Sequence, residues 1–269
     1  MLDPLQLLGY KFFQNALIGG GLAALACALI GLFVILRKES MIGDGVAHLS
    51  FGGIALGLFL GVNPLLTALV TAVIGVLTIG YMRKRGLAQS DSAIAVMLAV
   101  GFSTGLILIS LSGGFNVELF SYLFGSILTI SSLDLAIIAG LSLTSLLLIS
   151  IFYKELLSIT FDEEASRLMG IPVGLLENVF SVLVAVTIVL SIKVVGMILV
   201  VALLVLPGLT ALQLGFSFKR TVITAVAVGV FCVVSGVFAS ALFNVATSGI
   251  IVFVLVSVFL TVSAYKHLG

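Results

Sequence analysis

Long apolar stretches separated by short polar boundaries make up most of the chain. Charged side chains are absent from eight windows, residues 12–36, 45–82, 92–117, 119–133, 135–153, 178–192, 194–218 and 221–265. A membrane-spanning helix needs about 20 mostly apolar residues, so the windows 45–82 and 221–265 are each long enough for two spans. Polar turns at 62–64 and 244–249 divide them. The pattern therefore predicts an all-α, polytopic transmembrane bundle of about eight or nine spans.

Two stretches leave the number of spans open. Residues 112–133 form either a span or a helix packed at the outer surface, and residues 176–213 cross the membrane once or twice. The amino-terminal residues 1–14 mix leucine and phenylalanine with polar side chains, which predicts a short interfacial helix. No internal repeat is visible, so we expect one membrane-embedded domain over residues 1–269.

The composition supports this interpretation. Of the 269 residues, 61% are hydrophobic and only 9% are charged, against the roughly 25% of an ordinary soluble domain. Such a surface excludes a secreted enzyme and a cytosolic domain. A net charge of +1 gives no sign of a basic surface that binds nucleic acid. The apolar composition predicts a lipid bilayer as the surroundings of the chain.

Basic residues mark every second boundary and thereby orient the chain. They are Arg37 and Lys38, Arg83 to Arg85, Lys154 with Arg167, Lys219 with Arg220, and Lys266. By the positive-inside rule these boundaries face the cytoplasm, and the amino-terminal segment starts outside. Lys193 is the exception to the pattern. The predicted location is the bacterial plasma membrane.

Asp44 and His48 are ionisable residues inside the predicted second helix. If that helix starts near Ser40, a rise of about 1.5 Å per residue places them roughly 6 Å and 12 Å into the span. Residues four apart share one helix face, so a carboxylate and an imidazole at this spacing can bind one divalent metal. Other helices, water or a second subunit would have to complete the ligand shell. A structural Asp–His hydrogen bond, or an Asp44 at the cytoplasmic interface, explains the pattern equally well.

Small residues follow this pair along the same helix. Gly45, Gly53, Gly57 and Gly61 form a stripe, with Gly52 beside it. Small residues spaced by four allow membrane helices to approach closely. We expect this stripe to pack against another helix and to hold Asp44 and His48 towards a cavity.

The stretch from Tyr153 to Val173 is the largest polar insertion. Asp162, Glu163 and Glu164 suit the start of a short helix, and Gly170 with Pro172 suits its end. A short capped helix on the cytoplasmic face can dock into a groove of a partner protein, although a connecting loop is the simpler interpretation.

Pro207 interrupts an apolar helical pattern at 194–211. Proline removes a backbone hydrogen bond, and such breaks occur at the sites and gates of transporters. A packing kink or a helix end are the alternatives.

Sequence signatures of enzymes are absent. Leu111 to Gly114 spell part of the signature of ABC ATPases, but the chain has no GxxxxGK[ST] loop to hold phosphate. It also has no HExxH and no GxSxG motif. ATP hydrolysis, if it drives this protein, is therefore expected in a separate chain.

Four segments in order resemble the permease subunit of ABC-type importers of the zinc/manganese family, over nearly the whole chain. They are SMIGDGVAHLSFGGIALG at 40–57, ELFSYLFGSIL at 118–128, ELLSITFDEEASRLMGI at 155–171 and VVGMILVVALLVLPGLTA at 194–211. Ser166 and Gly208 stand where alanine is common in such permeases.

The resemblance implies a homodimeric permease with two docked ATPase subunits and an extracytoplasmic solute-binding protein that delivers the metal. It implies that Asp44 and His48 line the translocation path as a transient metal site. The cytoplasmic segment 155–171 would dock the ATPase, through Phe161, Asp162, Glu164, Ala165 and Gly170.

The identity of the metal stays open at this point. One carboxylate and one imidazole suit zinc, manganese or ferrous iron. The Phe-rich outer segment around Phe115 and Phe120 resembles zinc members slightly more, so zinc is the first expectation and manganese the alternative. A proton-coupled secondary transporter and an ABC permease for a vitamin or siderophore are rival functions.

Overall fold

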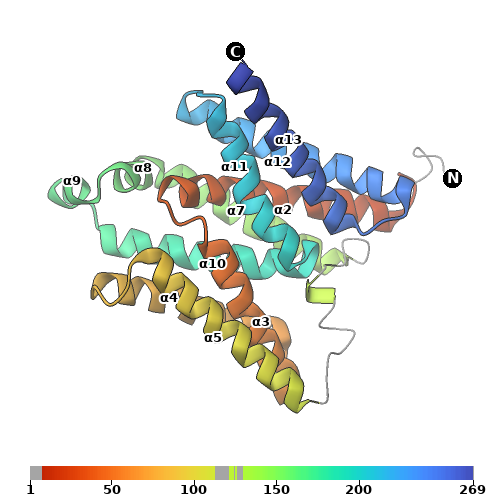
Figure 1. Cartoon of the computed structure of the whole chain (residues 1–269), viewed down its shortest axis with the longest axis horizontal. Helices are drawn as coiled ribbons and strands as arrows, with labels where there is room; N and C mark the ends of the chain where they lie inside the picture. The colour runs from red at the N-terminus through yellow and green to blue at the C-terminus, as the bar shows by residue number, and fades with distance from the viewer. Residues whose placement is uncertain (1–7, 113–120, 124, 126–129, 269) are drawn as a thin grey trace. The chain divides into compact units, whose positions relative to one another are not determined.

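The computed structural model describes residues 8–112, 121–123, 125 and 130–268, and this part of the chain contains helices and no strands (Figure 1). In chain order the helices are α2 (Lys11–Leu36), α3 (Ile42–Leu60), α4 (Pro64–Lys84), α5 (Ser90–Leu111), α7 (Ser132–Ile151), α8 (Tyr153–Phe161), α9 (Glu163–Leu168), α10 (Val173–Val195), α11 (Met197–Gln213), α12 (Phe218–Phe243) and α13 (Thr247–Leu268). The predicted all-α class is confirmed.

Eight helices of the described residues are long and apolar enough to cross a membrane, namely α2, α3, α4, α5, α7, α10, α12 and α13. The apolar helix α11 has 17 residues and is shorter. The prediction of eight or nine spans is therefore confirmed. The open segment 112–133 lies largely outside the described residues.

Two boundaries differ from the expectation. Lys11 to Gln14 form the first turn of the 26-residue helix α2, so the described part of the segment 1–14 is not a separate interfacial helix. Residues 1–7 of that segment lie outside the described part. The stretch 176–213 is divided by Gly196, whose φ of 87° requires glycine, because other residues rarely adopt that conformation. This glycine separates α10 from α11.

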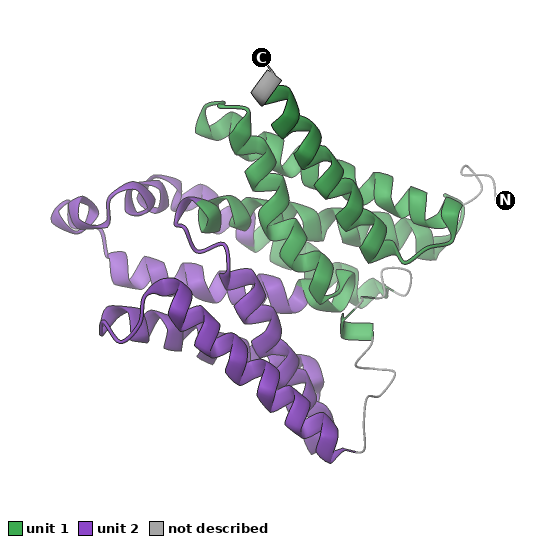
Figure 2. Ribbon diagram, in the orientation of Figure 1, with its two compact units in different colours: residues 1–35, 121–144, 191–269 green, residues 36–120, 145–190 purple. Residues whose placement is uncertain are grey.

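The described residues form two compact units (Figure 2). Unit 1 comprises residues 1–35, 121–144 and 191–269, and unit 2 comprises residues 36–120 and 145–190. Unit 2 contains the segments of the predicted metal site and the predicted docking site, 40–57 and 155–171.

In unit 2, α3 packs against both α4 and α5 through glycines (Figure 1). A Cβ atom at Gly53 would lie 2.7 Å from Cα of Ala68 on α4, and one at Gly52 would lie 2.5 Å from the carbonyl oxygen of Gly101 on α5. The prediction of tight packing along the glycine stripe is thus confirmed. Gly61 is the exception, because it adopts a φ of 68° and ends α3 instead of packing against a neighbour.

In unit 1, α11, α12 and α13 pack together, and α2 lies against α11. A Cβ atom at Gly31 of α2 would lie 1.7 Å from the carbonyl oxygen of Leu204. The helix α11 continues through the buried Pro207, so this residue is neither a helix end nor a break in the helix. The interruption falls at Gly196 instead. A role of Pro207 as a gate stays a prediction.

Candidate metal site and docking segment

The helix α3 places Asp44 and His48 on one face near its start. It begins at Ile42, two residues later than expected, so a rise of about 1.5 Å per residue puts the pair roughly 3 Å and 9 Å along the helix. Asp44 lies in the first turn, where the helix dipole favours a carboxylate. The surrounding residues of α3 are mostly buried, whereas these two side chains are 39% and 24% exposed. They therefore form the accessible polar part of an otherwise packed helix.

The two side chains face each other without a hydrogen bond. Nε2 of His48 lies 3.6 Å from Oδ1 of Asp44, beyond the 2.7–3.2 Å of an N–H···O bond. Two ligand atoms about 2.1 Å from one ion, at a tetrahedral angle, lie about 3.4 Å apart. The observed separation is thus close to that of two ligands of a shared cation. It argues against the alternative of a structural Asp–His hydrogen bond.

The imidazole of His48 has unused bonding capacity. Its Nδ1 atom is buried and has no hydrogen-bond partner in the described part of the chain. The ring packs edge-on against Phe102 of α5, with 5.2 Å between the centroids. Buried polar atoms normally find a partner, so an orphaned imidazole nitrogen requires an explanation. This atom is distinct from Nε2, the nitrogen that faces Asp44.

The pair does not make a complete metal site by itself. Among the described residues there is no group of three or more His, Cys, Asp or Glu side chains that could hold a metal. Two ligands leave a shell of four or more open to water, backbone oxygens or another chain. The arrangement can therefore hold a cation weakly and release it.

The predicted docking segment 155–171 contains two short helices, α8 and α9. The carboxylate of Asp162 caps α9, accepting a hydrogen bond from the backbone N–H of Ala165 at 2.9 Å, and Glu164 lies in the first turn. The predicted start of a helix at 162–164 is confirmed. The preceding helix α8 was not predicted.

Gly170 ends α9 in the left-handed conformation, with a φ of 82°. The N–H of Gly170 bonds to the carbonyl of Arg167, and the N–H of Ile171 bonds to that of Ser166, which is the Schellman arrangement. The predicted helix stop is confirmed. Ser166 itself is buried and bonds to Ser158 of α8 at 2.8 Å, so the two helices are fixed to each other.

Large apolar side chains project from this segment. Phe161, Leu168 and Met169 are 74%, 90% and 66% exposed. They surround the capped helix that carries Glu164 and Ala165, whereas Ile159 on the other side of α8 is buried. An exposed apolar tip on a rigid, capped helix suits insertion into a groove of a partner.

Two buried carboxylates in unit 2 were not among the predicted functional residues, namely Glu39 and Glu177, which are 7% and 4% exposed. Both pair with arginines that the sequence marked only as boundary residues, Arg37 and Arg83. The available signal was Glu177 itself, a lone acidic residue in an otherwise apolar stretch after Pro172. The segments around Phe115 and Phe120 lie outside the described residues.

Comparisons with known proteins agree with the motifs. The chain is 34% identical to the manganese transport system membrane protein MntC of Halalkalibacterium halodurans, over 94% of this chain and 87% of that protein. It is also 34% identical to the manganese import system permease protein ScaB of Streptococcus gordonii, over 93% of this chain and 90% of that protein. Both similarities extend over nearly the full length of the chain.

A solved structure is similar as well. The structure of PsaBC from Streptococcus pneumoniae in complex with Fab matches with a TM-score of 0.84 and 34% identity, covering 95% of this chain and 92% of that one. The model of the ABC 3 transport family matches residues 9–266. With its eight candidate spans, the chain is a multi-pass protein of the plasma membrane, and it belongs to the ABC 3 transport family.

Proposed function

We propose that this chain is the permease subunit of an ATP-driven importer of divalent metal ions, and that manganese is the metal. Two relatives that cover more than nine tenths of the chain are named as manganese transport proteins, which favours manganese over the zinc first expected from the sequence. Carboxylate and water ligands suit manganese, whereas imidazole is more typical of zinc and iron, so the preference for manganese rests on the relatives.

The observation that carries the proposal is the pair formed by Asp44 and His48. A carboxylate oxygen and an imidazole nitrogen lie 3.6 Å apart on one helix, so a small movement of the two side chains would let both bind one ion. In a membrane-spanning protein, an ionisable pair on an otherwise packed apolar helix is expected to mark an ion pathway. The metal is the cargo here, so binding has to be strong enough for entry and weak enough for exit.

Other groups must complete the ligand shell during transport. The described residues offer no third His, Cys, Asp or Glu beside the pair. In the proposed homodimer, a second copy would bring a second Asp44 and His48, while water and backbone oxygens could fill the remaining positions.

The permease is proposed to carry out no covalent chemistry. A separate ATPase subunit would dock on α9 around Phe161, Asp162, Glu164, Ala165 and Gly170, with the exposed Leu168 and Met169 beside them. An extracytoplasmic solute-binding protein would deliver the metal. ATP binding would displace the docking segment, and the helices would then alternate the access to Asp44 and His48.

The test is metal uptake by cells that lack their own importers. The chain would be expressed with its ATPase and solute-binding protein, and cellular manganese, zinc and iron would be measured by mass spectrometry. We expect manganese to rise with the native chain and the rise to be lost with His48→Ala at equal abundance in the membrane. The variant His267→Ala alters the only other histidine and should match the native chain.

Each outcome decides a separate part of the proposal. A rise in zinc or iron instead of manganese would change the substrate, and an unchanged rise with His48→Ala would refute the metal role of His48. Uptake that persists without the ATPase would favour a proton-coupled secondary transporter. No rise in any of the three metals would overturn the proposed function.

A further inference from the structure

A buried carboxylate in unit 2 binds basic residues from two other segments of that unit. Glu177, in the second turn of α10, is 4% exposed. One of its oxygens accepts hydrogen bonds from Nη2 of Arg37 at 2.8 Å and from Nη2 of Arg83 at 2.9 Å, and the other lies 4.0 Å from Nζ of Lys84. Arg37 directly follows α2, whereas Arg83 and Lys84 end α4. The charge of Glu177 therefore connects α10 to the residue that follows α2 and to the end of α4.

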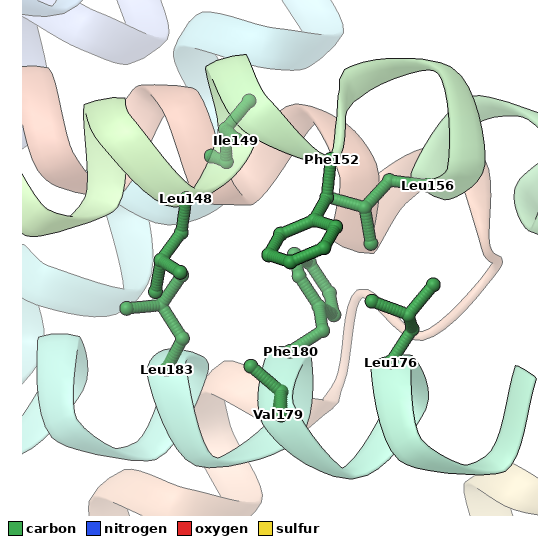
Figure 3. A pocket seen from close by; sticks show the side chains of 8 residues that line it. All are labelled: Leu148, Ile149, Phe152, Leu156, Leu176, Val179, Phe180 and Leu183. Carbon is green, nitrogen blue, oxygen red and sulfur yellow. The ribbon is translucent and has the colours of Figure 1, made fainter. Parts of the chain in front are cut away.

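The same part of α10 supports the docking segment. Ile159 of α8 forms a buried cluster with Val173 and Leu176 of α10, against which Phe152 and Ile171 pack. Figure 3 shows side chains from the end of α7 and from α8 facing those of α10 across an apolar pocket. A displacement of α8 and α9 would therefore act directly on the first turns of α10.

The arginines carry the connection onward to α3. Arg83 also forms an ion pair with Glu39, and Nε of Arg37 lies 3.8 Å from the carboxylate of the same residue. The carbonyl oxygen of Glu39 accepts a hydrogen bond of 2.9 Å from the backbone N–H of Ile42, the first residue of α3. Asp44 follows two residues later. Glu39 is thus fixed to the arginines by its side chain and to the start of α3 by its backbone.

We propose that Glu177, Arg37, Arg83 and Glu39 form a relay that transmits movement of the docking segment to the start of α3, where Asp44 and His48 lie. This inference rests on the proposed function, and it assigns the four residues as positioning residues, since none of them needs to touch the metal. The charges suit this role, because each arginine has two carboxylate partners and can shift between them without leaving a buried charge unpaired.

The packing makes such a relay stiff at both ends. At one end α8 and α10 share a buried apolar cluster, which does not deform continuously. At the other end the backbone of α3 is in direct contact with α5, since a Cβ atom at Gly101 would lie 2.3 Å from Cα of Leu49. The ion pairs between these two ends can exchange partners, because each arginine has two carboxylates within reach.

The experiment uses the complete complex of this chain, its ATPase and its solute-binding protein in proteoliposomes. Manganese uptake and ATP hydrolysis would be measured together for the native chain, Glu177→Gln and Glu177→Asp. The control is Asp91→Asn, which removes an exposed carboxylate at the start of α5. Manganese uptake by the native complex tests the proposed function. The ratio of manganese transported to ATP hydrolysed, compared between the variants and the native chain, tests the relay.

We expect Glu177→Gln to assemble and to hydrolyse ATP at the basal rate, but to lose the stimulation by loaded solute-binding protein and to transport at least about tenfold less manganese per ATP, equivalent to about 1.4 kcal/mol of coupling. Asp91→Asn should keep the native ratio. A native ratio with Glu177→Gln would overturn the relay. If Glu177→Gln fails to assemble, Glu177→Asp decides: the shortened carboxylate should lower the ratio, and an unchanged ratio would refute the proposal.

Discussion

Nζ of Lys193 on α10 lies 2.5 Å from Oδ1 of Asp134 on α7, within unit 1. The second oxygen of Asp134 accepts hydrogen bonds from the backbone N–H and the hydroxyl of Ser131, which fixes the carboxylate at the start of α7. This pair gives a physical reason for a basic residue, Lys193, that departs from the charge pattern. The charge of Lys193 is neutralised by Asp134, so this lysine does not indicate which side of the membrane its end of the helix faces.

We predict that Asp134→Asn destabilises the chain. The substitution leaves Lys193 without its carboxylate, but the lysine side chain is 37% exposed, so solvent limits the loss to about 1 kcal/mol. That corresponds to roughly 2–4 °C in the midpoint of thermal unfolding, measured on the detergent-solubilised chain. The double variant Asp134→Asn with Lys193→Met should recover part of the loss. Equal midpoints for native and single variant would contradict the prediction.

We predict that Gly101→Ala impairs unit 2 although it adds a single methyl group. The new Cβ would lie 2.3 Å from Cα of Leu49 and 2.7 Å from the carbonyl oxygen of His48, so α3 and α5 would have to separate. Overpacking of this kind costs about 1–3 kcal/mol. Thermal unfolding in detergent measures it. Gly80→Ala on α4 is the matched control, because its Cβ would meet no atom within 4 Å, and it should leave the midpoint unchanged or raise it.

We predict that Asp162→Ala weakens the association with the ATPase subunit. The change removes the acceptor for the N–H of Ala165, and α9 has only six residues with which to compensate. Loss of such a cap costs about 1 kcal/mol, or roughly a fivefold weaker association. Co-purification of the ATPase, titrated against its concentration, measures the change. Asp162→Asn keeps a capping oxygen and should stay near the native value; equal losses for both variants would point to the charge instead of the cap.

The features that were predicted well from the sequence depend on interactions between residues close together in the chain. In lipid, each span must satisfy the hydrogen-bonding groups of its own backbone, which favours a helix. The apolar windows and their charged boundaries therefore indicated the positions of the helices. The start of α9 at Asp162 and its end at Gly170 follow from capping chemistry within ten residues. The common face of Asp44 and His48 follows from helical periodicity alone.

The features that the sequence did not predict depend on partners distant in the chain. Arg37 and Arg83 are 140 and 94 residues away from Glu177 in the sequence. The residues next to each arginine in the sequence do not show whether it is paired or solvated. Gly196 lies in an apolar run, where a glycine can serve either close helix packing or a turn. Pro207 was therefore the residue that the sequence indicated as the interruption of the helix. The partner helices of the glycine stripe could not be assigned for the same reason.

The crowding of α3 restricts how the surroundings of His48 can vary. Where α3 meets α5, a larger side chain at Gly45 of α3 or Gly101 of α5 would displace its neighbours, since even a methyl group at either would lie within 2.6 Å of an atom of the other helix. The ring of Phe102, which packs against the imidazole, is 41% exposed and has room to change. Around the proposed metal site, variation is therefore sterically open at Phe102 and restricted at Gly45 and Gly101.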